Sequence, residues 1–414
     1  MGNDRGINVQ AQNDIEAARG TLTAGYESFL GAAREVEAII RARPDTTDLD
    51  LADGYLYLAG MWNFHLERVF KGYDLDRPCF VRDMDQIRTW GLPTPDHHYF
   101  SAQIDGMGEY RIIGNRGNTV DYCFEILSGL AGDDGVVGDR IDALETGRLQ
   151  TDADGRFELF VGGSPRSGNW MKAGAKARTV FVRQTVNDWT REQPTPMLIE
   201  RLGEGRAKLP FRRPSPDEVQ ALFVQAATEL VHQVRFMNDF SLNWAQILPL
   251  NELQAPAVGP ADAGYFPGQF NTKCRFKVHA DQALIITMEP STALYQSLAL
   301  AHPHWFNSIH YRNVQSSLNA TQSRVSSDGL FRFVISPKDP GVYNWLDTAG
   351  LESGFLFVRL QRLVSGRPPK KLDTKLVPFT AVRDEFPADE QRVDQETRFA
   401  IQRIRRLSAD KRYA

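Results

Sequence analysis

Two stretches of the chain resemble each other and decide the fold: DGRFELFVGGSPRSGNW at residues 154–170 and DGLFRFVISPKDPGVYNW at residues 328–345. In each, an Asp-Gly pair is followed by an Asn-Trp pair, 15 positions later in the first stretch and 16 in the second. A Phe-Val-Arg triplet then follows each stretch, at residues 181–183 and 357–359. Three ordered matches at similar spacing indicate an internal duplication.

Each copy has the pattern of short antiparallel strands. Asp-Gly is typical of tight hairpins, because glycine adopts the positive φ that such turns require. Strict alternation after each Asp-Gly pair predicts one buried face per strand; the inward residues are Phe157, Leu159 and Val161, and Phe331, Phe333 and Ile335. We therefore expect a mainly β protein with two tandem antiparallel β-sandwich units of jelly-roll type.

The Asn-Trp pairs allow two interpretations. Trp170 and Trp345 are expected to close the end of each sandwich, with Asn169 and Asn344 bonding to loop backbone groups. Alternatively, one of the two loops also contacts a ligand.

Helical segments are expected around the two units. Helical spacing predicts an N-terminal helical region, with a buried stripe at Tyr55, Leu58, Ala59, Trp62, Leu66 and Val69. Ser215 and Glu218 predict the capped start of a helix between the copies. The Arg-rich tail is expected to form a helix that packs across the protein or supports a homo-oligomer, with a thin apolar seam at Val393, Phe399, Ile404 and Leu407. The predicted segments are 1–95 (helical), 96–210 (first sandwich), 211–260 (bridging helix), 261–380 (second sandwich) and 381–414 (C-terminal helix).

Composition limits the partners. The net charge is −4, with 48 basic and 52 acidic residues, which argues against a broad nucleic-acid surface. No apolar run approaches the roughly 20 residues that span a bilayer. The three cysteines are far apart in the sequence, as suits a reduced interior. We expect a cytoplasmic protein that binds a small molecule and neither nucleic acid nor a membrane.

The repeated stretches, together with DHHYFSAQIDGMGEYRIIGNRG at residues 96–117, resemble the bacterial domain-of-unknown-function family twelve-fourteen. The resemblance implies paired jelly rolls, similar in shape to a bacterial amidase that removes N-linked glycans, and it implies no particular reaction. The chain differs from the family pattern at Ile113, where many relatives carry arginine, and at Glu352, where histidine often follows the Asp-Thr-Ala-Gly run.

The second copy carries more polar groups near its Asn-Trp pair than the first. Asp347 and Thr348 stand where the first copy has Lys172 and Ala173. Duplicated folds often keep one working site, so we predict catalytic roles for Asp347, Asn344 and His310. An Asp near a His can share acid–base work when burial shifts their pKa values.

Further residues are candidates for substrate binding. Arg111 or Arg116 could hold an anionic group or form an internal ion pair. Aromatic and basic residues could line a pocket; these are Trp189, Trp305, Tyr311 and Arg312. His302 and His304 are two apart in a possible strand and allow three interpretations: a metal site, hydrogen-bonded structural residues, or an acid–base pair.

Known nucleotide-binding and serine-hydrolase motifs are absent from the sequence. We therefore expect a cofactor-independent lyase or hydrolase that acts by acid–base chemistry on a small hydroxylated or partly apolar molecule. The alternatives are a non-catalytic carbohydrate-binding jelly roll and a structural oligomer without a ligand.

Overall fold

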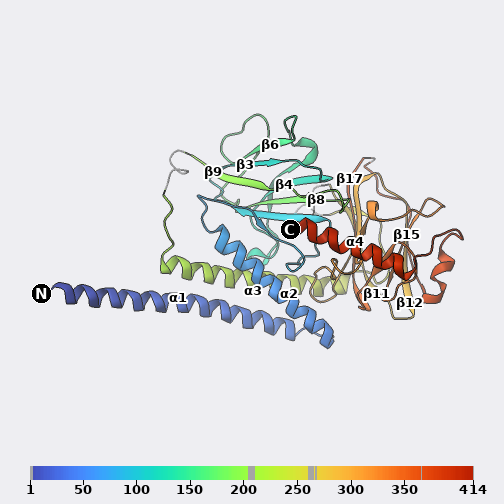
Figure 1. The fold of residues 1–414 in the computed structure, drawn as a ribbon, viewed down its shortest axis with the longest axis horizontal. Coiled ribbons are helices and arrows are strands. Elements are labelled where there is room, and N and C mark those ends of the chain that lie inside the picture. Colours follow the sequence, from blue (N-terminus) through green and yellow to red (C-terminus); the bar gives the residue numbers. More distant parts are fainter. Residues whose placement is uncertain (1–2, 204–209, 260–264, 266–267, 365, 414) are drawn as a thin grey trace.

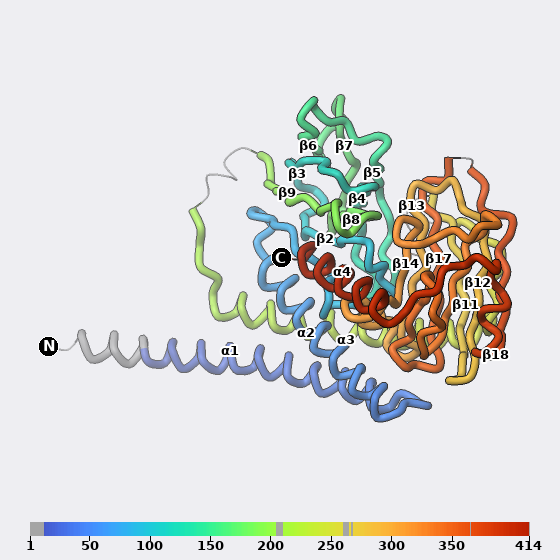
Figure 2. The backbone as a smooth tube through the Cα atoms, turned by 45° about the vertical axis from the view of Figure 1, so that its right-hand side comes forward, coloured from blue at the N-terminus to red at the C-terminus, as the bar shows by residue number. Residues whose placement is uncertain are grey.

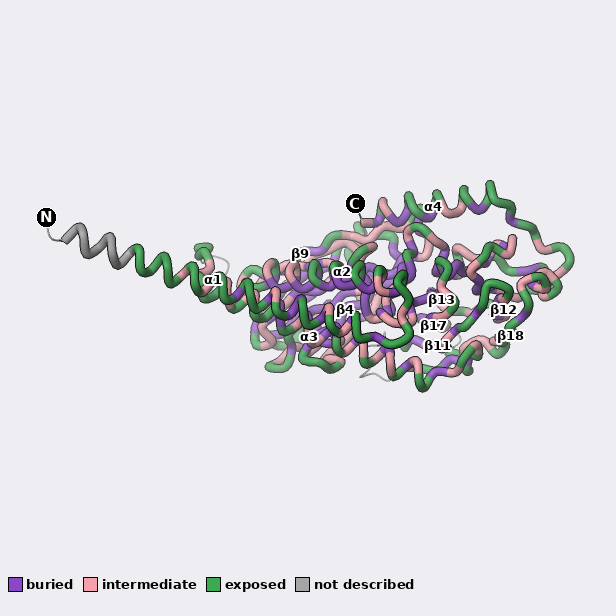
Figure 3. The backbone as a smooth tube through the Cα atoms, turned by 90° about the horizontal axis from the view of Figure 1, so that it is seen from below, coloured by how far each residue is buried: buried purple, intermediate pink, exposed green. Residues whose placement is uncertain are grey.

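A computed structural model of the 414-residue chain describes residues 3–203, 210–259, 265, 268–364 and 366–413, with residues 3–11 as backbone only. Three helices lie along one side of two β units (Figure 1). They are α1 (Asn3–Arg41), α2 (Asp48–Gly72) and α3 (Pro216–Ile247). Part of α1 extends beyond the rest of the protein with mostly exposed side chains (Figure 3). None of the described helices is long and apolar enough to cross a membrane.

Local sequence sets where two of these helices begin. Thr47 caps α2, where its hydroxyl accepts from the backbone N–H of Asp50 and the Asp50 carboxylate accepts from the Thr47 N–H. Ser215 and Glu218 form the same reciprocal cap at the start of α3, as predicted. The stripe predicted on α2 was partly wrong: Tyr55 is 46% exposed and Trp62 36%, because the buried face is centred on Tyr57, Met61 and Phe64.

The first unit consists of two sheets. One has the strand order β1-β2-β8-β4-β5 and the other β7-β6-β3-β9. Their bounds are β1 Val81–Arg82, β2 His97–Gln103, β3 Glu109–Asn115, β4 Asp121–Leu127, β5 Arg140–Glu145, β6 Arg156–Val161, β7 Trp170–Met171, β8 Thr179–Thr185 and β9 Met197–Leu202.

The second unit repeats this topology strand for strand. Its sheets have the orders β10-β11-β17-β13-β14 and β16-β15-β12-β18. The strands are β10 Ala257–Val258, β11 Phe270–Lys277, β12 Gln282–Met288, β13 Ala293–Ala301, β14 Ser317–Asn319, β15 Phe331–Ser336, β16 Trp345–Asp347, β17 Ser353–Leu363 and β18 Leu372–Pro378. The predicted duplication into two β-sandwich units is confirmed. One pairing in each copy, β6–β7 and β15–β16, is parallel, so the units are not purely antiparallel.

The two Asn-Trp pairs occupy equivalent places and make equivalent bonds. The Asn169 side chain binds the backbone N–H and C=O of Gln150 at 2.8 and 2.7 Å and the carbonyl of Glu158 at 3.0 Å. Asn344 makes the same three bonds, to the backbone of Arg324 and to the carbonyl of Arg332, at 2.8, 2.7 and 3.0 Å. Each Asn thereby ties the start of its closing loop to two neighbouring segments.

The tryptophans are equivalent as well. The Trp170 indole donates to the carbonyl of Gly162 at 2.9 Å, and the Trp345 indole donates to the carbonyl of Ser336 at 3.0 Å. Since Gly162 directly follows β6 and Ser336 is the last residue of β15, both at the end of the strand that begins after the Asp-Gly turn, the two loops close by the same contact.

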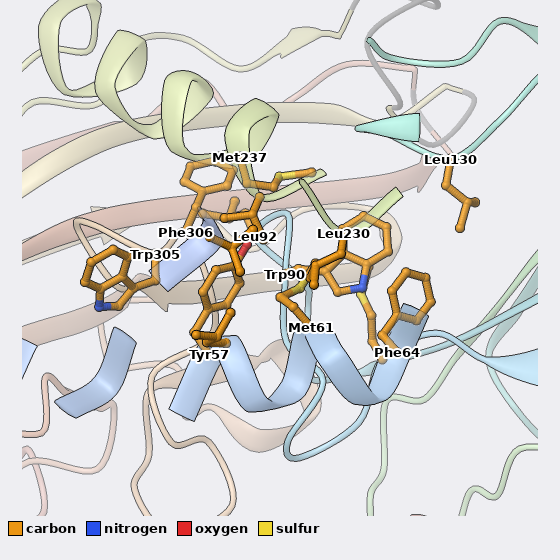
Figure 4. Packing of buried hydrophobic residues seen from close by; sticks show 14 of the residues in the cluster. Tyr57, Met61, Phe64, Trp90, Leu92, Leu130, Leu230, Met237, Trp305 and Phe306 are labelled. Carbon is orange, nitrogen blue, oxygen red and sulfur yellow. The ribbon is translucent and has the colours of Figure 1, made fainter. Parts of the chain in front are cut away.

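Apolar residues form a separate core in each sandwich and a third, larger core between the helices and the sheets. Figure 4 shows this third core, in which side chains from α2 and α3 meet residues such as Trp90, Leu92 and Phe306.

The C-terminal helix α4 (Gln395–Tyr413) lies across both units (Figure 2). The predicted apolar seam was wrong for three of its four residues: Phe399, Ile404 and Leu407 are exposed, whereas Val393, just before the helix, is buried. The buried face instead carries arginines seven positions apart. They donate to backbone carbonyls of both units: Arg398 to Val342, Arg405 to Tyr311 and Ser317, and Arg412 to Pro95.

Candidate functional site

The predicted histidine cluster lies in a cleft of about 1070 Å³ between the first half of α2 and the loop from β13 to β14, residues 302–316. The loop contributes three histidines, and two of the α2 carboxylates that line the cleft lie beside them. These five side chains are His302, His304, His310, Asp50 and Asp53.

Asp53 lies between two of the imidazoles. Its carboxylate is 3.2 Å from Nε2 of His310 and 3.6 Å from Nε2 of His302. The same His302 nitrogen is 3.3 Å from the Asp50 carboxylate. Since Nδ1 of His302 accepts from the His304 backbone N–H at 3.2 Å, the His302 proton must lie on Nε2, toward the two carboxylates. These distances place imidazoles and carboxylates alternately along the cleft, in the order His310, Asp53, His302 and Asp50.

The start of α2 positions the carboxylates. Asp50 is fixed by the helix cap, where it accepts from the Thr47 N–H at 2.8 Å and the Thr47 hydroxyl at 2.7 Å. Asp53 follows three residues later, so both side chains lie on the same face of the helix.

The loop is anchored beside these carboxylates by a buried tryptophan. The Trp305 indole donates to the backbone carbonyl of Asp50 at 2.8 Å and stacks on His302 and Tyr57. Figure 4 shows Trp305 and Tyr57 beside α2. Two loop residues, Phe306 and His310, have positive φ values of 55° and 29°. Such values are uncommon outside glycine and concentrate at functional sites.

The environment moves the pKa values of the two outer imidazoles in opposite directions. The hydrogen bond to Asp53 raises the pKa of His310 above its ordinary value. Burial, reinforced by the charge of His302, lowers the pKa of His304 to about 4. His304 is consequently neutral at pH 7, whereas His310 is closer to its charged form than a free imidazole.

Both carboxylates stay ionised. Burial acts to raise the pKa of Asp50 and of Asp53. The nearby His302 imidazole, together with hydrogen bonds from Thr47 to Asp50 and from His310 to Asp53, outweighs burial and holds both pKa values well below the ordinary range.

Three of the predicted site residues line this cleft: His310, Tyr311 and Arg312. Arg312 forms a two-point ion pair with Asp410 at 2.5 and 2.7 Å, and the Tyr311 hydroxyl bonds to that of Tyr413 at 3.0 Å. Both side chains thus also hold α4 in place.

The predicted pairing of Asp347 with His310 was wrong, because the carboxylate bonded to His310 is Asp53. Neither Asp347 nor Asn344 is among the residues that line the cleft in the described part of the chain. Asp347 accepts from the Ala349 N–H at 2.8 Å, within its own turn. Every bond of the Asn344 side chain described above goes to the backbone of Arg324 or Arg332, the two segments beside its closing loop.

The remaining predicted residues lie elsewhere. Arg111 is ion-paired with Glu200 and, at 3.2 Å, with Glu158. Arg116 donates to Thr119 and to the Val120 carbonyl at 3.1 and 3.2 Å. Trp189 is buried beneath α4, where its indole donates to Asp96 at 2.6 Å. Trp305 is at the cleft but behind His302.

Sequence reasoning missed Asp50 and Asp53. The available signal was the run TTDLDLADG at residues 46–54, in which a helix cap is followed by acids on one face. Among the described residues, no three His, Cys, Asp or Glu side chains are grouped so that they could hold a metal ion.

Comparison with known proteins supports the fold. No protein-family model and no curated protein matches the chain. A crystal structure of an uncharacterised protein from Burkholderia cenocepacia is similar over 88% of this chain and 100% of its own, with a TM-score of 0.79 and 25% sequence identity. A Vibrio parahaemolyticus protein aligns over 77% of this chain and 98% of its own, with a TM-score of 0.42 and 10% identity.

Proposed function

We propose that the cleft is the active site of a hydrolase or lyase in which His310 transfers the proton and Asp53 orients it. The observation that carries this proposal is the bond between the half-exposed His310 imidazole and Asp53 inside a large open cleft. The resemblance to the family of paired jelly rolls supports no specific reaction.

The bond to Asp53 places the His310 proton on Nε2 and leaves Nδ1 as the basic nitrogen. Nδ1 can then accept a proton from water or from a carbon next to the breaking bond, and Asp53 stabilises the imidazolium that forms. His302 and Asp50 act as positioning residues, because His302 contacts Asp53 on its other side and Asp50 in turn contacts His302. In a hydrolase the activated water attacks the substrate, whereas in a lyase the same base removes the proton that starts elimination.

The cleft walls favour a neutral, hydroxylated or cationic substrate with an apolar part. Four aspartates lie along α2 and just before it: Asp45, Asp48, Asp50 and Asp53. Exposed apolar side chains complete the rim, with Leu49 75% exposed, Leu56 59% and Ile87 67%. An anionic substrate would be repelled by this charge.

Two measurements test the proposal. An NMR pH titration of the histidines should give His310 a pKa above the ordinary value of 6.5, and Asp53→Asn should lower it. Turnover of a panel of p-nitrophenyl esters and glycosides should fall about 100-fold or more in His310→Ala. His232→Ala, on α3 and outside the cleft lining, is the matched control.

An unshifted His310 pKa would contradict the dyad. Turnover that survives in His310→Ala would remove the catalytic assignment. Saturable binding of a sugar without any turnover would favour the carbohydrate-binding alternative instead.

A further inference from the structure

A second cavity, of about 170 Å³, lies where the two β units meet α3. It shares no lining residue with the histidine cleft. Its walls are mostly apolar and include aromatic rings from both units and the helix: Trp90, Phe181, Phe240, Trp244, Phe306 and Phe357. An apolar cavity of about 150 Å³ is large enough to bind benzene. This cavity therefore suits one aromatic ring or a short acyl chain.

The repeated Phe-Val-Arg triplets contribute to this cavity from both copies. Phe181 and Arg183 line it from β8, and Phe357 and Arg359 line it from β17. Because β8 and β17 are equivalent strands, the duplication places two equivalent arginines around one apolar space.

The two arginines differ in their partners. Arg183 is paired with Glu125 at 2.7 Å, and Arg140 shares the same carboxylate at 3.3 Å. Strand registers identify the equivalent of Glu125 in the second copy: Glu125 lies opposite Phe181, and Ala299 lies opposite Phe357. The second copy thus carries a methyl group where the first carries the carboxylate.

Arg359 is left with a buried charge. It is 8% exposed, and its Nη2 donates to the Leu92 carbonyl at 2.7 Å. Its Nη1 is buried and has no hydrogen-bond partner among the described residues. The Phe357 ring, 4.1 Å from the guanidinium, offsets part of the cost of burying that charge. An uncompensated buried charge is nevertheless costly, and a bound anion would remove that cost.

Lys273 adds to the positive charge nearby. Its ammonium lies 4.1 Å from the centre of the Trp244 ring and is bonded to the Tyr265 hydroxyl. Burial and the charge of Arg359 lower the pKa of Lys273 to about 8. One carboxylate, Glu125, therefore faces three arginines and a nearby lysine across the described part of the site.

We propose that this cavity binds a small carboxylate with an apolar body, such as an aromatic acid or a short fatty acid, whose carboxylate pairs with Arg359. A guanidinium can bind a carboxylate through two parallel hydrogen bonds. The aromatic walls would bury the ring or chain. The proposal is independent of the function proposed for the cleft, whose charge is the opposite.

The test uses the full chain with benzoate and octanoate as probes, and with benzyl alcohol, octanol and inorganic phosphate as controls. Calorimetry should detect saturable binding of one of the two carboxylates below about 1 mM. The alcohol of the same size should bind at least about tenfold more weakly, and phosphate should not bind.

Two variants test the role of charge. Ala299→Glu restores the carboxylate of the first copy, and Arg359→Met removes the cation at similar length; each should weaken carboxylate binding at least about tenfold. Arg156→Met, with its side chain 71% exposed on β6, should leave binding unchanged.

Three outcomes would overturn the proposal. They are the absence of saturable carboxylate binding to the wild type, equal binding of the alcohols, and unchanged binding in Arg359→Met. If Ala299→Glu does not fold, binding by Arg359→Met and the comparison with the alcohols still test the proposal, because neither places a larger side chain in the core.

Discussion

The two loops that join equivalent strands in the two copies differ in the charged side chains that they carry. The β4–β5 loop, residues 128–139, is rich in glycine and aspartate and lines the aromatic cavity. The β13–β14 loop, residues 302–316, carries three histidines and lines the acidic cleft. Both loops pack on α2, which offers Arg68 to the first and Asp50 and Asp53 to the second. The helix α2 thus presents a positive charge to the loop of the first copy and negative charges to the loop of the second.

The ion pairs that join the two loops to α2 also differ in burial. Arg68 and Asp133 form a buried two-point pair at 2.8 and 2.6 Å, which Glu229 of α3 joins at 3.1 Å. The second loop keeps His310 half exposed beside Asp53. We infer that the first loop is fixed for stability, whereas the second keeps a titratable group accessible.

The largest expected effect is from Asp133→Asn. Removing one partner of a buried ion pair leaves Arg68 undercompensated, and the expected loss is about 3 kcal/mol of unfolding free energy. Urea unfolding measures the loss. Asp134→Asn is the matched control, because Asp134 is an exposed partner of Arg178 and should lose about 1 kcal/mol or less. Equal losses in the two variants would contradict a structural role for the first loop.

The second expected effect is on the pH dependence of stability, which should come from the histidine loop. His304 has a native pKa of about 4 against an ordinary value of 6.5, so the unfolded chain binds more protons between these values. Stability should therefore fall as the pH drops from 6.5 toward 4, by up to about 3 kcal/mol. The groups that face His304 are Arg43, His302, Asp50 and Asp45.

Unfolding free energies between pH 7 and pH 4.5 check this expectation. His304→Gln should flatten the slope relative to the wild type, whereas His279→Gln, at an exposed histidine outside the cleft lining, should not. A slope unaffected by His304→Gln would show that the acid sensitivity comes from elsewhere.

The third expected effect is equal in the two copies. Asn169→Ala and Asn344→Ala each remove three bonds to the backbone, and each should lose about 1–3 kcal/mol of unfolding free energy. The measurement is urea unfolding of both variants side by side. A much larger loss of turnover in Asn344→Ala than its loss of stability explains would restore the catalytic role predicted for Asn344.

The sequence predicted the duplication well, because local signals define it: the Asp-Gly turns, the alternating strands and the Asn-Trp pairs all act within a few residues. The helix faces were harder. On α4 the buried arginines donate hydrogen bonds to backbone carbonyls of distant segments, and Arg412 also packs on the Trp189 indole. Residue spacing along the sequence does not indicate such distant partners.

The candidate site was predicted only in part for the same reason. His310 and its neighbours Tyr311 and Arg312 were found from their cluster. The carboxylate partner of His310 was assigned to Asp347 of the same copy, whereas it is Asp53, 257 positions away along the chain. Only the packing of α2 against the β13–β14 loop brings those two residues together.

The smallest expected change in stability is from Asp53→Asn, and it sharpens the contrast with Asp133. Asp53 and His310 are partly exposed, so their pair should contribute about 1 kcal/mol or less. Because Asp53 raises the native pKa of His310, this contribution should be fully present below pH 6.5 and lost as the pH rises through the native pKa. Below the ordinary aspartate pKa of 3.8 it should fade again as the pH falls toward the much lower native pKa of Asp53, because the unfolded chain then binds a proton that the native carboxylate does not.

Unfolding free energies of Asp53→Asn at pH 5.5 and pH 8.5 measure this directly, and the difference from the wild type should be larger at pH 5.5. A loss as large as that of Asp133→Asn would mean that both loops are held by structural ion pairs. A small loss together with a lowered His310 pKa would instead support a role for the α2 carboxylate of Asp53 in proton transfer by His310, with little contribution to the stability of the fold.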